Sequence, residues 1–268
     1  MTSLVGSHDV LMVTLDTLRY DVAVEALARG QTPALQKVLP EGAWEERHSP
    51  GTFTYAAHHA FFAGFLPTPA QPGPHPRRFA LRFAGSETTN PQTEVFDSAD
   101  LISGFAGRGY HTLCIGGVGF FNLQNPLGRV LPGLFIEKHW RPELGVTEPR
   151  STEHQVAQIS TSLSALPPGK RCFTFLNVSA LHQPNKFYVE GASRDSKETQ
   201  AAALAYVDTQ LPALFTLAAR RAPCFVMIGS DHGTAYGDDG YRGHRLAHPV
   251  VTTVPWAEFT LPQGWRAP

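Results

Sequence analysis

The sequence predicts an α/β fold with a central, mostly parallel sheet. Short apolar runs alternate with stretches of helical pattern along most of the chain. Several of these runs are apolar at successive positions, which is typical of strands that helices cover on both faces. The 268 residues, 42% of them hydrophobic, are enough for one substantial core. We therefore expect a single domain over residues 1–268.

The expected elements follow in chain order. Strands are predicted at Asp9–Leu15, Arg78–Phe83, His111–Gly116, Cys172–Val178 and Cys224–Gly229, where apolar runs have strand length. Helices are predicted at Leu18–Arg29, Tyr55–Gly64, Ser98–Gly107, Thr152–Leu166 and Ser196–Arg221, the last kinked or split by Pro212. The Pro-rich stretch 66–76 predicts a long surface loop, and residues 250–268 predict one short strand followed by irregular chain.

Charge and cysteine usage narrow the class of protein. With 22 Lys and Arg against 23 Asp and Glu, and no basic run, we expect neither nucleic acid nor a membrane surface as a partner. The start of the chain lacks a basic region, its apolar run stops at Asp16, and no run is long enough for a membrane span. The three cysteines lie in strand-like runs without C-x-x-C spacing, which predicts buried reduced thiols. These features together predict a cytoplasmic protein.

Polar residues follow three of the predicted strands, at the ends where open α/β sheets bind ligands. Asp16 ends the first strand, although a helix-capping role would also suit it. Asp231 and His232 follow the strand that ends at Gly229, and Gly233 would permit a tight turn. A carboxylate beside an imidazole is a usual pair for Zn²⁺ or Mn²⁺, while an Asx turn with a surface histidine is the alternative. His182 follows the middle strand.

A hydroxyl residue also stands at a predicted helix start. Thr54 begins a stretch of small and aromatic residues, and His58 lies one turn further on. A hydroxyl at a helix N-terminus faces unpaired N–H groups, which favour an alkoxide and bind phosphate-like or sulfate-like anions. The alternative is that Thr52 or Thr54 is only an N-cap.

Together these segments resemble the alkaline phosphatase superfamily, in its branch of sulfatases, phosphonate monoester hydrolases and phosphoglycerol transferases. The resemblance lies in VLMVTLDTLRYD, SPGTFTYAAHHAFFAGFLP, FLNVSALHQPN and SDHGTAYGDDGYRGH, which occur in the family's order. It implies an alkaline-phosphatase-like α/β/α sandwich. It also implies a metal site made of Asp16, Asp231, His232 and the oxygen of the nucleophile.

The family's nucleophile stands four residues before a basic residue, as in T-x-P-S-H. The resemblance therefore implies that Thr54 is the nucleophile and His58 its helix-borne partner, with Thr52 as the alternative because Ala56 replaces the proline. It further implies that His182 and His244 hold the transferred group or protonate the leaving oxygen.

Two departures refine this expectation. The nucleophile position holds Thr54 instead of Cys or Ser, which argues against a formylglycine sulfatase. No carboxylate stands just before His182, where two-metal members have one, so we expect a single divalent ion. The carboxylate, imidazole and alkoxide ligands suit Zn²⁺ or Mn²⁺, whereas Ca²⁺ and Mg²⁺ fit less well. Arg19, and Arg242 or Arg245, could bind the remaining charge of the substrate or be solvated surface residues.

The sequence thus predicts a metal-dependent hydrolase or transferase that acts on a small anionic ester, namely a phosphomonoester, phosphodiester or phosphonate. The alternative is a sulfatase-like fold used as a metal-binding accessory or biosynthetic metalloprotein without ester hydrolase activity. The oligomeric state does not follow from the sequence.

Overall fold

A seven-stranded sheet forms the centre of the computed structural model, which describes residues 3–64, 79–80, 94–95 and 100–267. The strand order is β2-β11-β8-β1-β7-β5-β6, and the last five of these strands run parallel to one another. β11 runs antiparallel between β8 and β2. The mostly parallel sheet that the sequence predicts is therefore confirmed. Its strands are β1 (Asp9–Leu15), β2 (Glu45–His48), β5 (His111–Ile115), β6 (Glu137–His139), β7 (Cys172–Val178), β8 (Cys224–Gly229) and β11 (Thr253–Leu261).

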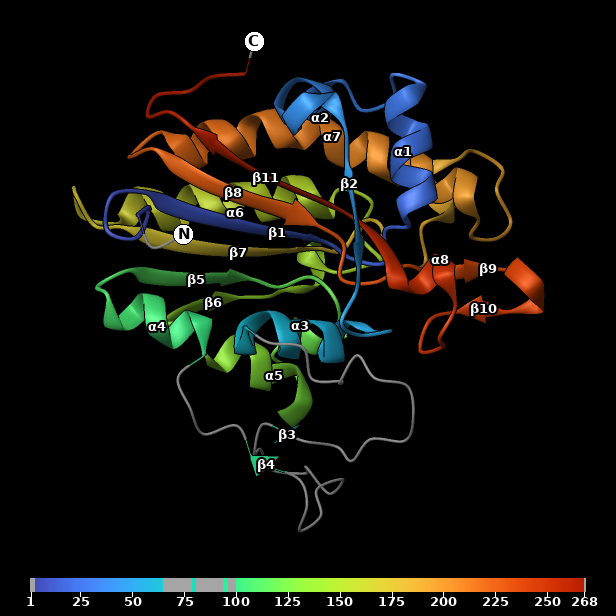
Figure 1. Cartoon of the computed structure of the whole chain (residues 1–268), viewed down its shortest axis with the longest axis horizontal. Helices are drawn as coiled ribbons and strands as arrows, with labels where there is room; N and C mark the ends of the chain where they lie inside the picture. Colours follow the sequence, from blue (N-terminus) through green and yellow to red (C-terminus); the bar gives the residue numbers. More distant parts are fainter. Residues whose placement is uncertain (1–2, 65–78, 81–93, 96–99, 268) are drawn as a thin grey trace.

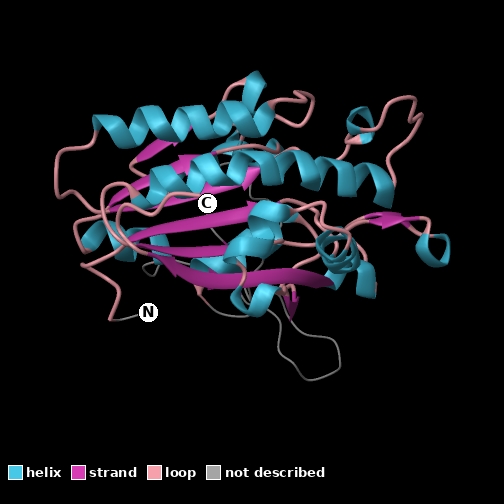
Figure 2. Cartoon of the chain, turned by 90° about the horizontal axis from the view of Figure 1, so that it is seen from above, coloured by secondary structure: helices cyan, strands magenta, loops and turns pink. Residues whose placement is uncertain are grey.

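Helices cover both faces of this sheet, which gives the three layers of an α/β/α sandwich (Figures 1 and 2). One face carries α1 (Tyr20–Ala28), α2 (Pro33–Val38), α6 (Ser151–Ala165) and α7 (Lys197–Ala219). The other face carries α3 (Thr54–Ala63), α4 (Leu101–Gly107) and α5 (Pro126–Gly133).

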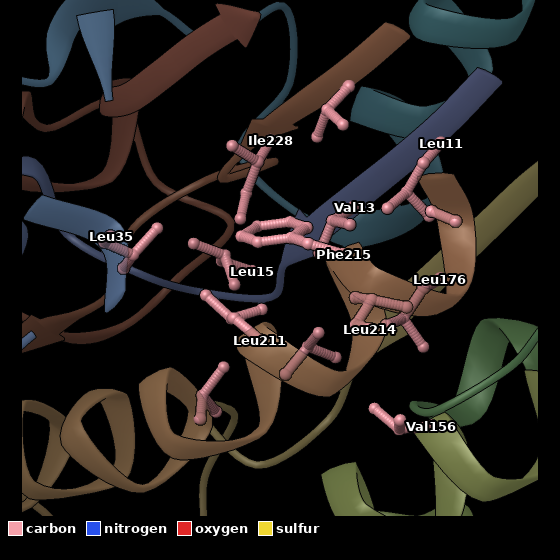
Figure 3. Packing of buried hydrophobic residues seen from close by; sticks show 14 of the residues in the cluster. Leu11, Val13, Leu15, Leu35, Val156, Leu176, Leu211, Leu214, Phe215 and Ile228 are labelled. Atoms are coloured by element: carbon pink, nitrogen blue, oxygen red, sulfur yellow. The ribbon is translucent and has the colours of Figure 1, made fainter. Parts of the chain in front are cut away.

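The central strand β1 explains why there are two cores. Its side chains alternate between the faces, so Leu11, Val13 and Leu15 join one apolar cluster while Val10 and Met12 join the other. Figure 3 shows the first cluster, in which side chains of α7 pack beside those of β1 and β8. Full burial of such a side chain contributes about 1.5–3 kcal/mol, so both layers stabilise the position of β1.

Helix α7 is continuous from Lys197 to Ala219, so Pro212 does not split it, and of the predicted kink or split only the kink stays a prediction. A capping box starts the helix: the Ser196 hydroxyl accepts the N–H of Thr199, and the Thr199 hydroxyl accepts the N–H of Ser196. Within the described residues, α7 is the one helix that is long and apolar enough to cross a membrane. Its apolar side chains form part of the first core cluster.

Other boundaries differ from the prediction in ways that have local causes. α4 begins at Leu101 because the Asp100 side chain caps it by accepting the N–H of Ser103 at 2.8 Å, while Ser98, where the predicted helix begins, lies outside the described residues. Of the strand predicted at Arg78–Phe83, the structure describes β3 (Phe79–Ala80), which pairs with β4 (Glu94–Val95). The predicted loop 66–76 lies outside the described residues.

The three cysteines, Cys114, Cys172 and Cys224, are buried and unpaired, as the sequence predicts. Burial raises the pKa of each thiol, so these groups stay protonated at neutral pH.

Candidate functional site

Three neighbouring strands bring the predicted site residues to one edge of the sheet. In the parallel register, Thr14 of β1 lies beside Asn177 of β7 and Gly229 of β8. The segments that leave these strands therefore begin side by side. Asp16 and Asp231, each within two residues of a strand end, are completely buried there.

Carboxylate and histidine side chains form a cluster at this edge of the sheet. Ligand atoms of Asp16, Asp231 and His232 all lie within 4.8 Å of one another, and among the described residues this is the one such group of three or more histidine, cysteine or acidic side chains that could hold a metal ion. The Thr54 hydroxyl oxygen lies 3.4 Å from Oδ2 of Asp16 and 3.3 Å from Nε2 of His232. The structure thus brings together the four residues that the sequence assigns to one metal site.

The donor atoms of this cluster fit a divalent cation. Oδ1 of Asp16 and Oδ2 of Asp231 are buried and have no hydrogen-bond partner in the described structure. Burial raises the pKa of both carboxyl groups, that of Asp231 to about 7, and the nearby charge of Asp231 raises the pKa of Asp16 further. His232 donates from Nδ1 to the Gly233 carbonyl at 2.8 Å, which leaves the Nε2 lone pair directed into the cluster.

A strained turn after β1 sets the position of Asp16. Thr17 has φ of 64°, a left-handed conformation that is rare for a β-branched residue. Its N–H donates to Oδ1 of Asp231 at 3.2 Å, and its hydroxyl donates to the Leu181 carbonyl at 3.1 Å. α1 begins only at Tyr20, so Asp16 does not cap that helix. Because Thr17 directly follows Asp16, its hydrogen bond to Asp231 holds the Asp16 segment beside the Asp231 carboxylate.

Asn177 is a residue whose contribution the sequence does not reveal. Its Nδ2 donates to Oδ2 of Asp16 at 2.9 Å, and its Oδ1 accepts the N–H of Val118 at 2.9 Å. The available signal is a single amide at the end of a strand that is otherwise apolar. A neutral amide holds the Asp16 carboxylate in place without adding a third negative charge.

Gly233 is needed for a different reason from the expected one. A Cβ at this position would lie 1.9 Å from the Val250 carbonyl oxygen, at α8 (Pro249–Thr252). The Gly233 N–H donates to the Val251 carbonyl at 2.7 Å. Close approach of the backbone, and not a left-handed turn, therefore excludes a side chain here.

Thr54 is the first residue of α3, and its surroundings suit an anion. The N-cap residue, Phe53, makes no side-chain hydrogen bond to the helix, and the N–H groups of a first helical turn have no partner within the helix itself. The alternative that Thr52 or Thr54 caps the helix is therefore wrong. Unpaired N–H groups at a helix N-terminus attract negative charge, here beside the Thr54 hydroxyl.

His58 lies beneath Thr54 and is completely buried. Its Nδ1 donates to the Thr54 carbonyl at 2.7 Å, and its Nε2 accepts the Thr14 hydroxyl at 3.0 Å. Burial lowers the pKa of His58 to about 3, so the ring is neutral. These contacts describe a residue that positions the first turn of α3. Four aromatic rings surround it, those of Phe61, Phe62, Phe121 and Phe175.

His182 and His244 lie next to the cluster, as the family resemblance implies. The His244 ring centroid is 4.7 Å from that of His232 and 5.8 Å from that of His182. His182 donates from Nδ1 to the Gln183 carbonyl, whereas Nδ1 of His244 has no hydrogen-bond partner in the described structure. Burial and the two neighbouring imidazoles lower the pKa of His244 to about 3. The site thus carries three adjacent imidazoles.

The arginines are arranged differently from the expectation. The guanidinium of Arg19 is buried and donates to Asp21 and to Asp238, with shortest distances of 2.7 Å to each. These pairs give Arg19 a structural role in place of the expected substrate-binding one. Arg242 is exposed on β10 (Arg242–Gly243), which pairs with β9 (Ala235–Tyr236), and none of its described contacts reaches the cluster. Arg245 instead contacts the loop before Thr54, through its N–H to the Thr52 carbonyl.

Solved structures share this fold at low sequence identity. The C-terminal periplasmic domain of the phosphoethanolamine transferase EptC from Campylobacter jejuni matches with a TM-score of 0.62 and 15% identity, over 95% of this chain and 80% of that one. The corresponding Escherichia coli domain, a complex with Zn, matches with a TM-score of 0.62 and 13% identity, over 97% of this chain and 74% of that one. An alkaline phosphatase superfamily protein from Vibrio parahaemolyticus matches with a TM-score of 0.59 and 15% identity, over 97% of this chain and 62% of that one. These matches show that the predicted α/β/α fold is shared with these structures.

These neighbours correct the expected location. The Campylobacter and Escherichia structures are both periplasmic domains, which contradicts the prediction of a cytoplasmic protein. That prediction rested on reduced cysteines and on the start of the chain. The three thiols, however, are buried, so their reduced state does not identify the compartment.

A comparison with curated proteins gives no match. The family model described as Sulfatase, in contrast, matches residues 8–253, which include every residue of the site described above. On this evidence, and in agreement with its three-layered fold, the chain belongs to the sulfatase family.

Proposed function

We propose that this protein is a metal-dependent hydrolase or transferase of phosphate-type esters in which Thr54 is the nucleophile. The observation that carries the proposal is the position of the Thr54 hydroxyl. It lies at the uncapped start of α3 and within 3.4 Å of both Asp16 and His232. The substrate would be a small anionic ester.

Asp16, Asp231, His232 and the Thr54 oxygen would hold the metal ion, with Zn²⁺ or Mn²⁺ as the ions that suit carboxylate and imidazole ligands. Zn²⁺ is the first choice because one structural neighbour is a zinc complex. When bound, the ion would lower the pKa of the Thr54 hydroxyl and offset negative charge on the reacting phosphoryl group.

The residues of the chain would perform the remaining steps. The Thr54 hydroxyl gives up its proton to water, and its oxygen forms a bond to phosphorus while the bond from phosphorus to the leaving oxygen breaks. The N–H groups at the start of α3 stabilise the added negative charge. His182 supplies the proton that the leaving oxygen takes up, because the lowered pKa of His244 leaves that ring neutral. Water or an acceptor alcohol then displaces the Thr54-bound group, which gives hydrolysis or transfer. A formylglycine mechanism does not apply, because threonine cannot form that aldehyde.

Replacement of the nucleophile tests this proposal. We expect Thr54→Ala to lower kcat on aryl phosphate, aryl phosphodiester or phosphonate ester by about a thousandfold or more, because the covalent step is lost. The measurement uses zinc-loaded and manganese-loaded protein and follows release of nitrophenolate. Thr52→Ala is the matched variant, and we expect it to retain most of the activity.

Loss of activity in Thr52→Ala but not in Thr54→Ala would move the nucleophile to Thr52. Full activity in Thr54→Ala would remove the covalent mechanism altogether. A metal-loaded protein that is inert toward every ester of the panel would favour a metal-binding accessory or biosynthetic role.

A further inference from the structure

Arg245 has an unusual backbone conformation directly beside the candidate nucleophile loop. Its φ is 70°, a left-handed conformation that costs a residue with a side chain about 1 kcal/mol or more. Its N–H donates to the Thr52 carbonyl at 2.8 Å, which fixes the backbone of Arg245 against the segment that leads into α3. The surrounding structure thus holds Arg245 in one strained position.

An aromatic ring holds the side chain in a defined place. The Arg245 guanidinium carbon lies 5.4 Å from the centre of the Phe53 ring, within the range of a cation–π contact. Phe53 immediately precedes Thr54, and its ring in turn packs against Phe120 with centroids 6.0 Å apart. The positive charge therefore lies against the ring of the residue that directly precedes the candidate nucleophile.

This charge has no acidic partner in the described part of the chain, since none of the ion pairs there includes Arg245. The nearby turn 237–240 contains two aspartates, but both are engaged. Asp238 binds Arg19 at 2.7 Å, and Asp239 lies 3.0 Å from Nε2 of His248. The Arg245 guanidinium is therefore exposed, and both aspartates of this turn are engaged elsewhere.

We propose that Arg245, supported by Phe53, binds a second anionic group of the substrate, such as a carboxylate or another phosphate, beyond the phosphoryl group that Thr54 attacks. The inference rests on the proposed function and narrows its substrate class. A guanidinium pairs with carboxylate and phosphate oxygens through two parallel N–H donors. A substrate with an ammonium group at the same position would instead meet a like charge without compensation. The site thus selects an anionic substituent over a cationic one.

Ligand binding tests this selectivity independently of turnover. Three phosphonates of matched length serve as probes, carboxyethylphosphonate, propylphosphonate and aminoethylphosphonate, and calorimetry measures their Kd with the zinc-loaded protein. We expect the carboxylate probe to bind about tenfold more tightly than the propyl probe, the ammonium probe to bind most weakly, and Arg245→Gln to abolish these differences.

Arg220→Gln is the matched control, because it removes the same charge from an exposed residue at the carboxyl end of α7. We expect it to keep the wild-type order of affinities, and Arg245→Lys to restore part of the preference. Equal binding of the three probes to the wild-type protein, or an unchanged order in Arg245→Gln, would overturn the inference.

Turnover of nitrophenyl phosphodiesters with the same three substituents separates the two proposals. Thr54-dependent turnover without a carboxylate preference would contradict the role of Arg245 and leave the chemistry intact. A carboxylate preference in binding, with no Thr54-dependent turnover, would remove the chemistry and support the anion site. We expect both the turnover and the preference.

Discussion

His58 shows how the environment of one residue decides its role. The ring is neutral because burial lowers its pKa to about 3, whereas in the unfolded chain the pKa is near 6.5. The unfolded state therefore binds an additional proton as pH falls below about 6.5, so acid destabilises the folded protein through this residue. Between pH 7.5 and 5.0 we expect His58 to account for about 2 kcal/mol of lost unfolding free energy.

Urea unfolding of the wild-type protein and of His58→Asn at these two pH values measures the effect. The asparagine amide can still donate to the Thr54 carbonyl but takes up no proton, so the variant should be less stable overall and less sensitive to pH. An identical loss of stability in both proteins would show that His58 is not the group responsible.

At the scale of elements, Arg19 links the turn after β1 to the β9–β10 hairpin. Its guanidinium binds Asp238 in the turn between β9 and β10, and Asp21 at the start of α1. We expect Arg19→Met to lower the unfolding free energy by about 2–3 kcal/mol, because several charge-assisted hydrogen bonds of a buried group are lost. Denaturant unfolding at neutral pH measures this change.

Asp238→Asn is the milder comparison, because its side chain is 26% exposed and an amide oxygen still accepts a hydrogen bond. The paired Arg19 also lowers the pKa of Asp238, so this contribution to stability should be lost only in strong acid. A variant Arg19→Met with unchanged stability and an increased KM would instead support the substrate-binding role that the sequence suggested.

At the scale of the whole molecule, the candidate metal site joins three separate segments. Asp16 follows β1, Thr54 begins α3, and Asp231 and His232 follow β8, so an ion bound there would stabilise the folded chain against the unfolded one. With free Zn²⁺ at about 100 times its Kd, linkage contributes about 2.7 kcal/mol. We expect removal of the metal by a chelator to lower Tm by about 5–10 °C.

Thermal unfolding before and after dialysis against the chelator tests this expectation, together with elemental analysis, which should give one ion per chain. In Asp231→Asn the added Zn²⁺ should shift Tm much less, because one ligand charge is lost. Equal Tm values for the metal-loaded and metal-free wild-type protein would contradict a structural contribution from this site.

The sequence by itself determined the fold class and the segments that carry the site. Strands with apolar residues on both faces must be covered by helices, and this local pattern is readable in β1, β7 and β8. Polar residues at the ends of such strands stand out for the same reason. Asp231 and His232 were therefore identifiable as a candidate ligand pair, whereas their grouping with Asp16 and the Thr54 oxygen in one metal site followed from the family resemblance.

Only the tertiary structure decided what the remaining side chains contact. Arg19 looks like a substrate-binding residue in the sequence, but the fold places Asp238, which lies 219 positions later, against its guanidinium. Conversely, Arg245 gained its place beside Phe53 through a hydrogen bond to Thr52. Such contacts join residues that are distant in the chain, so the local sequence pattern does not predict them. Charged side chains find their partners only when the segments pack together. The packing therefore also decides which charged side chains remain available to a substrate.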